Sequence, residues 1–219
     1  MMQLLLTRPY ADSVALAVFL KTHNIQSIIS PVMHIERSGT PLDIAGYDGI
    51  IVTSRHALTS IKDAKLPCYV VGEHTAHMAH NQGLRVAAWA QTAQYLDRLL
   101  PLDLVYLYPC AAHIRHEFTP NVRRKVVYTA IAAESLSNEA IKSIQDNAIS
   151  GIALYSPRSA EILCALIEQH ELQAFTPNIS LYCISEAVAQ NARKLIWKSL
   201  HIATAPDNVA MQELLILSK

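Results

Sequence analysis

Short apolar runs alternate along the chain with longer segments whose apolar residues recur at helical spacing. The first run, QLLLT (3–7), predicts a buried strand, and DSVALAVFLKTHN (12–24) predicts a helix capped by Asp12 or Ser13. Further runs that predict strands are IQSIISPV (25–32), GIIVTS (49–54), CYVVG (68–72), LVYLY (104–108), KVVYTA (125–130), IALYS (152–156) and LYCIS (181–185). This alternation predicts an α/β fold in which helices cover the faces of parallel sheets.

The pattern occurs twice. GIIVTSRHAL (49–58) aligns with GIALYSPRSA (151–160), so that Gly49 pairs with Gly151, and YVVGEHTAHMA (69–79) aligns with YCISEAVAQNA (182–192). Two copies of about 105 residues predict two similar α/β domains, and such pairs typically bind a ligand in the cleft between them. Generic α/β patterning is the alternative explanation, but the shared order of consecutive elements favours a duplication.

Composition narrows the class of protein. Hydrophobic residues make up 51% of the 219 residues and charged residues 16%, which excludes a disordered polyelectrolyte. Lys and Arg together number 18, as do Asp and Glu, and this zero net charge disfavours a partner that is nucleic acid or a membrane surface. The six glycines form no G-x-G, which excludes the usual dinucleotide and Walker phosphate loops.

The sequence predicts a cytoplasmic protein. Arg8, Pro9 and Asp12 interrupt the apolar start, so no signal peptide is expected there, and no apolar run is long enough to span a membrane. The four cysteines are far apart and form no C-x-x-C pair, so buried reduced thiols are expected rather than disulfides or a metal site.

Hydroxyl side chains follow several predicted strands in both halves. They are Thr53, Ser54, Thr75, Ser156 and Ser185. In an open α/β sheet the carboxyl ends of strands and the amino ends of helices meet at one edge, where free N–H groups and hydroxyls attract anions. Each residue alone could be a plain helix cap, but the recurrence in both halves favours an anion-binding role.

Tyr128 is expected at the end of the β-rich VVYTA segment, between the two copies, and its phenol could donate a proton or a hydrogen bond to a leaving hydroxyl. The alternative is a tyrosine that only packs and bonds to a loop. On a helix, His74 and His80 would lie about 120° apart around the axis. The side chains of His74, His77 and His80 therefore cannot converge on one ion, and no metal site is expected. No G-x-S-x-G is present to place a hydrolase nucleophile.

Taken in order, several segments resemble uroporphyrinogen-III synthase, an enzyme family of heme biosynthesis. They are LLTRP (5–9), the strand at Pro31, YDGIIVTSRHAL (47–58), YVVGEHTA (69–76), Arg115 in a helix before KVVYTA, IALYSP (152–157) and IATAPDNVAMQELL (202–215). The resemblance covers essentially the whole chain. It implies one domain built from residues 1–34 with 132–219, a second from 37–129, and a two-stranded β connection between them.

The resemblance also implies an activity. Enzymes of this family convert hydroxymethylbilane, a linear tetrapyrrole with eight carboxylates: the hydroxyl is lost, the terminal pyrrole inverts through a spiro intermediate and the macrocycle closes. A monomer without metal or cofactor is expected. Tyr128 matches the family's tyrosine thought to assist loss of the hydroxyl. The implied substrate-binding residues are Arg8, Thr53, Ser54, Gly72, Thr75, Ser156 and Ser185.

One segment departs from the family. Where the family has a glycine followed by two threonines, this chain has Ile184 to Val188, so two hydroxyls are missing and Glu186 adds a negative charge. That charge would repel a polyanion unless it points away. A second class of function is therefore kept, a two-lobed protein that binds an anionic small molecule without catalysis.

Overall fold

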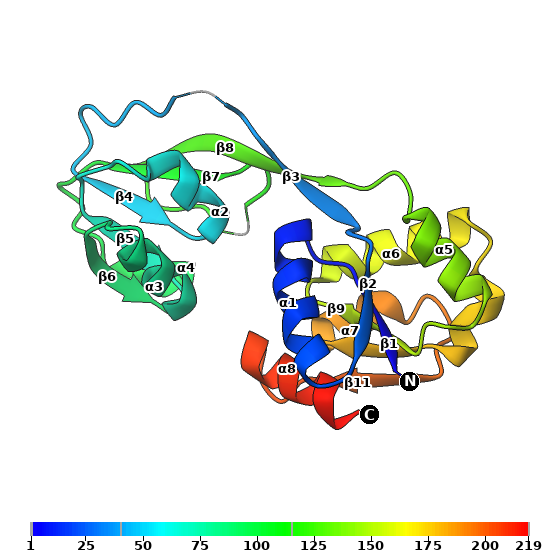
Figure 1. Cartoon of the computed structure of the whole chain (residues 1–219). Helices are drawn as coiled ribbons and strands as arrows, with labels where there is room; N and C mark the ends of the chain where they lie inside the picture. The colour runs from blue at the N-terminus through cyan, green and yellow to red at the C-terminus, as the bar shows by residue number, and fades with distance from the viewer. Residues whose placement is uncertain (1, 40, 115, 219) are drawn as a thin grey trace. The chain divides into compact units, whose positions relative to one another are not determined.

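The chain folds into two compact units, Met1–His34 with Ile131–Lys219 (unit 1) and Ile35–Ala130 (unit 2) (Figure 1). The structure is a computed structural model that describes residues 2–39, 41–114 and 116–218. Arg115, which the family resemblance placed in a helix, lies outside the described residues. Within those residues, every helix is too short or too polar to cross a membrane.

Unit 1 contains a five-stranded sheet in the order β11-β10-β9-β1-β2, whose neighbouring strands are parallel. The strands are β1 (Gln3–Leu6), β2 (Gln26–Ile29), β9 (Gly151–Leu154), β10 (Ser180–Cys183) and β11 (Ser199–Ile202). The helices are α1 (Tyr10–Thr22), α5 (Asn138–Gln145), α6 (Pro157–Gln169), α7 (Glu186–Ala192) and α8 (Asn208–Leu217), with a 3-10 helix at Gln173–Asn178. The strand order reverses between β1 and β9, a position at which open α/β sheets bind ligands.

Both faces of this sheet are covered, which explains its continuous apolar runs. Successive side chains of a strand point to opposite faces. Leu5 accordingly packs with residues of α5, α6 and α7, whereas Leu4 and Leu6 pack with residues of α1 and α8.

Unit 2 is built on a six-stranded sheet in the order β3-β8-β7-β4-β5-β6. Its strands are β3 (Met33–Arg37), β4 (Gly49–Val52), β5 (Cys68–Val71), β6 (Val86–Ala90), β7 (Tyr106–Ala111) and β8 (Val122–Ala132). Its helices are α2 (Arg55–Leu58), α3 (Glu73–Asn81) and α4 (Ala93–Leu99), with a 3-10 helix at Thr59–Ile61. The pairs from β8 through β6 are parallel.

The two faces of this second sheet pack against different segments. Ile50 and Val52 lie in one buried cluster with residues of α2 and α3. Ile51 lies in another, with Leu96 of α4 and Phe118 of the segment 112–121 that joins β7 to β8. Phe118 therefore helps α4 to cover this face of the sheet.

Aligned parts of the sequence occupy equivalent strands, and the predicted α/β class is confirmed. β4, β5 and β6 correspond to β9, β10 and β11, while β7 and β8 correspond to β1 and β2. The two paired positions require glycine for the same reason, which is a tyrosine ring close to the backbone. A Cβ at Gly49 would lie 2.9 Å from the Tyr69 ring, and one at Gly151 would lie 2.4 Å from the Tyr182 ring.

Three local predictions were wrong. Helix α1 begins at Tyr10 with Pro9 as its cap, because Asp12 pairs with Arg8 and the Ser13 hydroxyl donates to the Arg8 carbonyl. The described residues of the segment 112–121 form no helix, because the Ala112 carbonyl accepts from Arg124 and the Thr119 N–H donates to Asp97 instead. Tyr128 lies within the long strand β8 and does not end it.

Candidate active site

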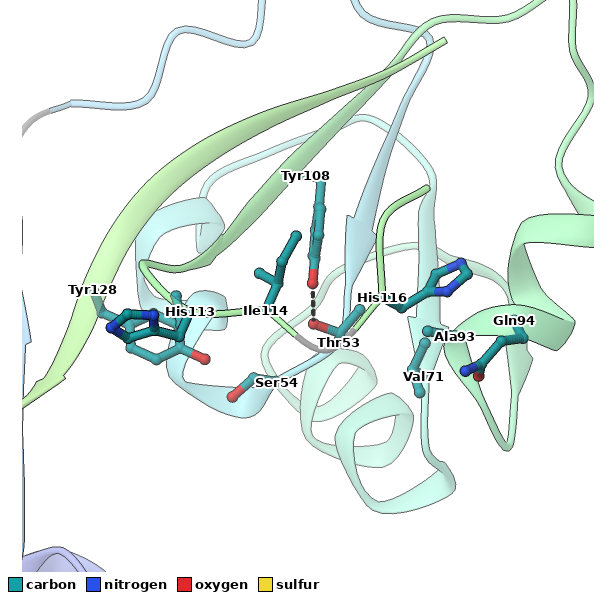
Figure 2. A pocket seen from close by; sticks show the side chains of 11 residues that line it. Thr53, Ser54, Val71, Ala93, Gln94, Tyr108, His113, Ile114, His116 and Tyr128 are labelled. Atoms are coloured by element: carbon teal, nitrogen blue, oxygen red, sulfur yellow. Dashed lines mark hydrogen bonds between the residues drawn. The ribbon is translucent and has the colours of Figure 1, made fainter. Parts of the chain in front are cut away.

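A cavity of about 530 Å³ opens at the carboxyl edge of the sheet of unit 2 (Figure 2). Residues at or beyond the ends of β4, β5 and β7 line it, as expected because parallel strands end at the same edge. It lies where the strand order reverses between β4 and β7, the point that binds ligands in such sheets. The lining residues are Thr53, Ser54, Val71, Ala93, Gln94, Tyr108, Ala111, His113, Ile114, His116 and Tyr128.

A hydrogen bond joins the two strands at this point. The hydroxyl of Thr53, which follows β4, lies 2.9 Å from the phenol oxygen of Tyr108 on β7 (Figure 2). Tyr108 is buried, and its ring meets Phe118 edge-on with the ring centroids 5.0 Å apart. Burial raises the pKa of Tyr108, so its phenol is protonated at neutral pH.

Ser54 and Tyr128 form the second polar pair of the cavity. Ser54 caps α2, where its Oγ accepts a hydrogen bond from the His56 N–H at 3.3 Å. Tyr128 is 8% exposed. Burial raises the pKa of Tyr128, and a side-chain hydrogen bond with Ser54 acts in the opposite direction. The Tyr128 phenol therefore keeps its proton at neutral pH, and the side chain itself is largely shielded from water.

The segment 112–121 forms one wall of the cavity and is fixed by Asp97 of α4. His116 Nε2 lies 3.1 Å from one Asp97 oxygen. The other oxygen accepts hydrogen bonds from the N–H and the hydroxyl of Thr119, at 3.2 and 2.9 Å. These bonds explain how this segment, whose described residues form no helix, keeps His113, Ile114 and His116 at the cavity.

The lining of the cavity suits an anionic ligand. It contains hydroxyls, an amide and imidazoles, and none of its described lining residues is a carboxylate. Across residues 2–39, 41–114 and 116–218, no three His, Cys, Asp or Glu side chains gather as ligands of a metal ion. The arrangement can hold a carboxylated molecule by hydrogen bonds and offer it a neutral phenol.

Two other predicted residues of unit 2 lie beside the cavity without lining it. Gly72 follows the lining residue Val71 and caps α3 with a φ of +85°, a conformation that favours glycine. Thr75 lies in the first turn of α3, and its Oγ1 would be 3.9 Å from a Cβ at Gly72.

The remaining predicted residues belong to unit 1. Arg8 already has several partners: its guanidinium lies over the Tyr155 ring, donates to Asn208 at 3.1 Å and pairs with Asp12 at 3.4 Å. The nearby Thr7 hydroxyl donates to the Ala153 carbonyl at 2.8 Å, across the gap between β1 and β9.

The two predicted serines of unit 1 differ. Ser156 caps α6, and its Oγ accepts from the Ser159 N–H at 3.0 Å. Ser185 stands at the same position before α7, but its side chain makes no capping bond. Glu186, the expected source of repulsion, pairs with Arg193 at 3.1 Å, which offsets its charge.

Sequence reasoning missed Tyr108, Gln94 and His116 as cavity residues. A signal for Tyr108 was available, because the run that it ends aligns with the first run of the chain, whose end carries Thr7 and Arg8. For His116 the spacing alone gave no signal, since its partner Asp97 precedes it by 19 residues in a different element.

Comparisons with known proteins bear on the family and the fold of this chain. The family model described as "Uroporphyrinogen-III synthase HemD" matches residues 14–213. The fold is similar to that of uroporphyrinogen-III synthetase from Helicobacter pylori 26695, with a TM-score of 0.65, 16% identity and 100% of each chain covered. A mutant uroporphyrinogen III synthase from the extremely thermophilic bacterium Thermus thermophilus matches with a TM-score of 0.54 and 13% identity, covering 98% of this chain and 96% of the other. No protein with a curated description matches significantly. The match of the family model over most of the sequence shows that this chain belongs to the uroporphyrinogen-III synthase family.

Proposed function

We propose that this chain cyclises hydroxymethylbilane to the type III macrocycle and that Tyr128 assists loss of the hydroxyl. The family is one of cyclising lyases in tetrapyrrole biosynthesis. The observation that carries the role of Tyr128 is the position of its protonated, largely buried phenol in the cavity of unit 2, beside the Ser54 hydroxyl.

Loss of the substrate hydroxyl does not require Tyr128 to be a strong acid. The C–O bond of the substrate breaks, and the departing hydroxyl leaves as water once it has received a proton. A phenol can donate that proton or a strong hydrogen bond to it. Because the substrate ionises readily and can close unaided, the enzyme mainly has to hold one geometry and exclude water. A neutral tyrosine that is itself largely buried suits that task.

Hydroxyls and backbone amides suit the substrate's eight carboxylates. In unit 2, Thr53 and Ser54 line the cavity. In unit 1, we assign Arg8, Ser156 and Ser185 to substrate binding at the carboxyl edge of its own sheet. Ser185 supports this role best, because helix capping does not occupy its hydroxyl. Gly72 and Thr75 complete the proposed set.

The test is the isomer made from hydroxymethylbilane. The purified protein would receive substrate freshly produced by the preceding enzyme, with and without a chelator, and the products would be resolved by chromatography. We expect the type III isomer to predominate in both conditions. Type I product alone, formed at the uncatalysed rate, would contradict the proposal and leave a protein that binds an anionic small molecule without catalysis.

We further propose that the protein works as a cytoplasmic monomer whose partner is this small molecule and not nucleic acid. The four cysteines support a reducing compartment, because all are buried free thiols. The zero net charge supports the absence of a nucleic-acid partner.

A further inference from the structure

His116 is held in a defined orientation at the wall of the cavity. Its Nε2 lies 3.1 Å from Asp97 Oδ2, and both side chains are mostly buried. The edge of its ring meets Phe118, with centroids 4.8 Å apart and an interplanar angle of 81°. The hydrogen bond from Nε2 to Asp97 and the packing against Phe118 together fix the orientation of the imidazole ring, including the direction of Nδ1.

One ring nitrogen remains for a ligand. With Nε2 donating to Asp97, Nδ1 has no hydrogen-bond partner among the described residues. A protonated imidazole donates from both nitrogens, so it can bond to Asp97 and to an anion together. Asp97 is suited to this arrangement because Thr119 donates twice to its other oxygen, which leaves Oδ2 to the imidazole.

We propose that His116, oriented by Asp97, binds one carboxylate of the linear tetrapyrrole and of its cyclised product. The identity of the ligand rests on the proposed function, whereas the site rests on the geometry of the His116–Asp97 pair, called the dyad below. His116 is a substrate-binding residue in this proposal, and Asp97 is a positioning residue that acts through it. The site would fix the register of one pyrrole ring relative to Tyr128, which lines the same cavity.

The test measures binding rather than turnover. Uroporphyrin III, the oxidised macrocycle, keeps all eight carboxylates and can be titrated against the protein by fluorescence. We expect His116→Gln to weaken its binding about tenfold, the effect of losing one hydrogen bond to a charged group. Asp97→Asn should weaken binding to a similar degree. The double variant should bind no more weakly than His116→Gln alone, because both changes remove the same contact.

Thr119→Val is the matched control. It removes a hydrogen bond from the same Asp97 and loosens the same wall, but leaves the dyad of His116 and Asp97 intact. We expect its affinity for uroporphyrin III to stay within about twofold of the unmodified protein, since it removes no ligand contact. Thermal unfolding of each variant would verify that it is folded at the assay temperature.

The results separate this inference from the proposed function. If His116→Gln binds uroporphyrin III as the unmodified protein does, or if Thr119→Val weakens binding equally, the dyad only supports the wall and the inference is wrong. Failure of the unmodified protein to bind uroporphyrin III would also overturn it. The isomer assay decides the proposed function independently, because type III product can form whichever residue holds the carboxylate.

Discussion

The Thr53 hydroxyl lies 2.9 Å from the Tyr108 phenol oxygen and joins β4 to β7 where the strand order of unit 2 reverses. In unit 1, the Thr7 hydroxyl spans the equivalent gap by donating to the Ala153 carbonyl at 2.8 Å. In each unit, a threonine hydroxyl thus bridges the two strands between which the strand order reverses. In unit 2 the partner is a side chain, so this bridge adds a phenol to the wall of the cavity.

This pair predicts an asymmetry between two variants. Tyr108→Phe leaves a partly exposed threonine without its partner and should cost about 1 kcal/mol of stability. Thr53→Val leaves the phenol of the buried Tyr108 unpaired and should cost about 2 kcal/mol. Urea unfolding of both variants and of the double variant tests this. Additive losses in the double variant would show that the two hydroxyls do not interact.

The paired glycines predict a ranking. A Cβ at Gly151 would lie 2.4 Å from the Tyr182 ring and 3.1 Å from the Ser180 carbonyl oxygen, which is backbone and cannot easily move. The three atoms nearest to a Cβ at Gly49 all belong to side-chain rings, at 2.9 to 3.1 Å. Gly151→Ala should therefore destabilise the protein by about 3 kcal/mol and Gly49→Ala by about 1–2 kcal/mol. Equal or reversed losses in urea unfolding would argue against the two contacts described.

Substitutions of Ser156 and Ser185 in unit 1 should have different effects, one on stability and the other on substrate binding. Ser156→Ala removes the cap of α6 and should cost about 1 kcal/mol. Ser185→Ala removes no capping bond, so its unfolding midpoint should not change. If Ser185 binds substrate, its variant should instead raise the KM for hydroxymethylbilane. A stability loss in Ser185→Ala with unchanged KM would assign it a structural role only.

The buried thiols predict alkaline destabilisation. Burial raises the pKa of Cys68 and Cys164 to about 11 and that of Cys183 to about 12. An unfolded cysteine ionises with a pKa of about 8.5, so above this pH the unfolded chain binds fewer protons than the folded one. Stability should therefore fall as pH rises from about 9 to 12.

Urea unfolding at pH 8 and pH 10 measures this loss of stability. Thiol labelling tests the burial from which the prediction follows. At pH 8 the native protein should react slowly with an aromatic disulfide reagent, and all four cysteines should react at once after unfolding in urea. Rapid labelling of any cysteine in the native protein would show that its thiol is not buried.

Much of the fold could be predicted because its signals are local. Buried parallel strands give continuous apolar runs, so most strands were found within a few residues. The aligned glycines Gly49 and Gly151 revealed the repeat because each faces a tyrosine ring on the next strand. Competition between local contacts was harder to foresee. The start of α1 depends on the i,i+4 ion pair of Arg8 and Asp12, which occupies the carboxylate that was expected to cap the helix.

The candidate site was only partly predictable. Strand ends gave Thr53 and Ser54, and the family resemblance gave Tyr128. The wall that faces them comes from the segment 112–121, whose described residues form neither helix nor strand and are held by Asp97 through His116 and Thr119. Sequence periodicity carries no information about such a segment, because its conformation depends on side-chain hydrogen bonds to a distant helix.

The rate of the first turnover tests the central claim, the role of Tyr128, most directly. Excess enzyme would be mixed with fresh hydroxymethylbilane and type III product followed with time for Tyr128→Phe and for Tyr95→Phe, which removes an exposed phenol of α4. We predict that Tyr128→Phe slows formation of the type III isomer about 100-fold, the scale of a lost proton donor, without weakening substrate binding. Tyr95→Phe should react as the unmodified protein does. Type III formation by Tyr128→Phe at the unmodified rate would contradict the account.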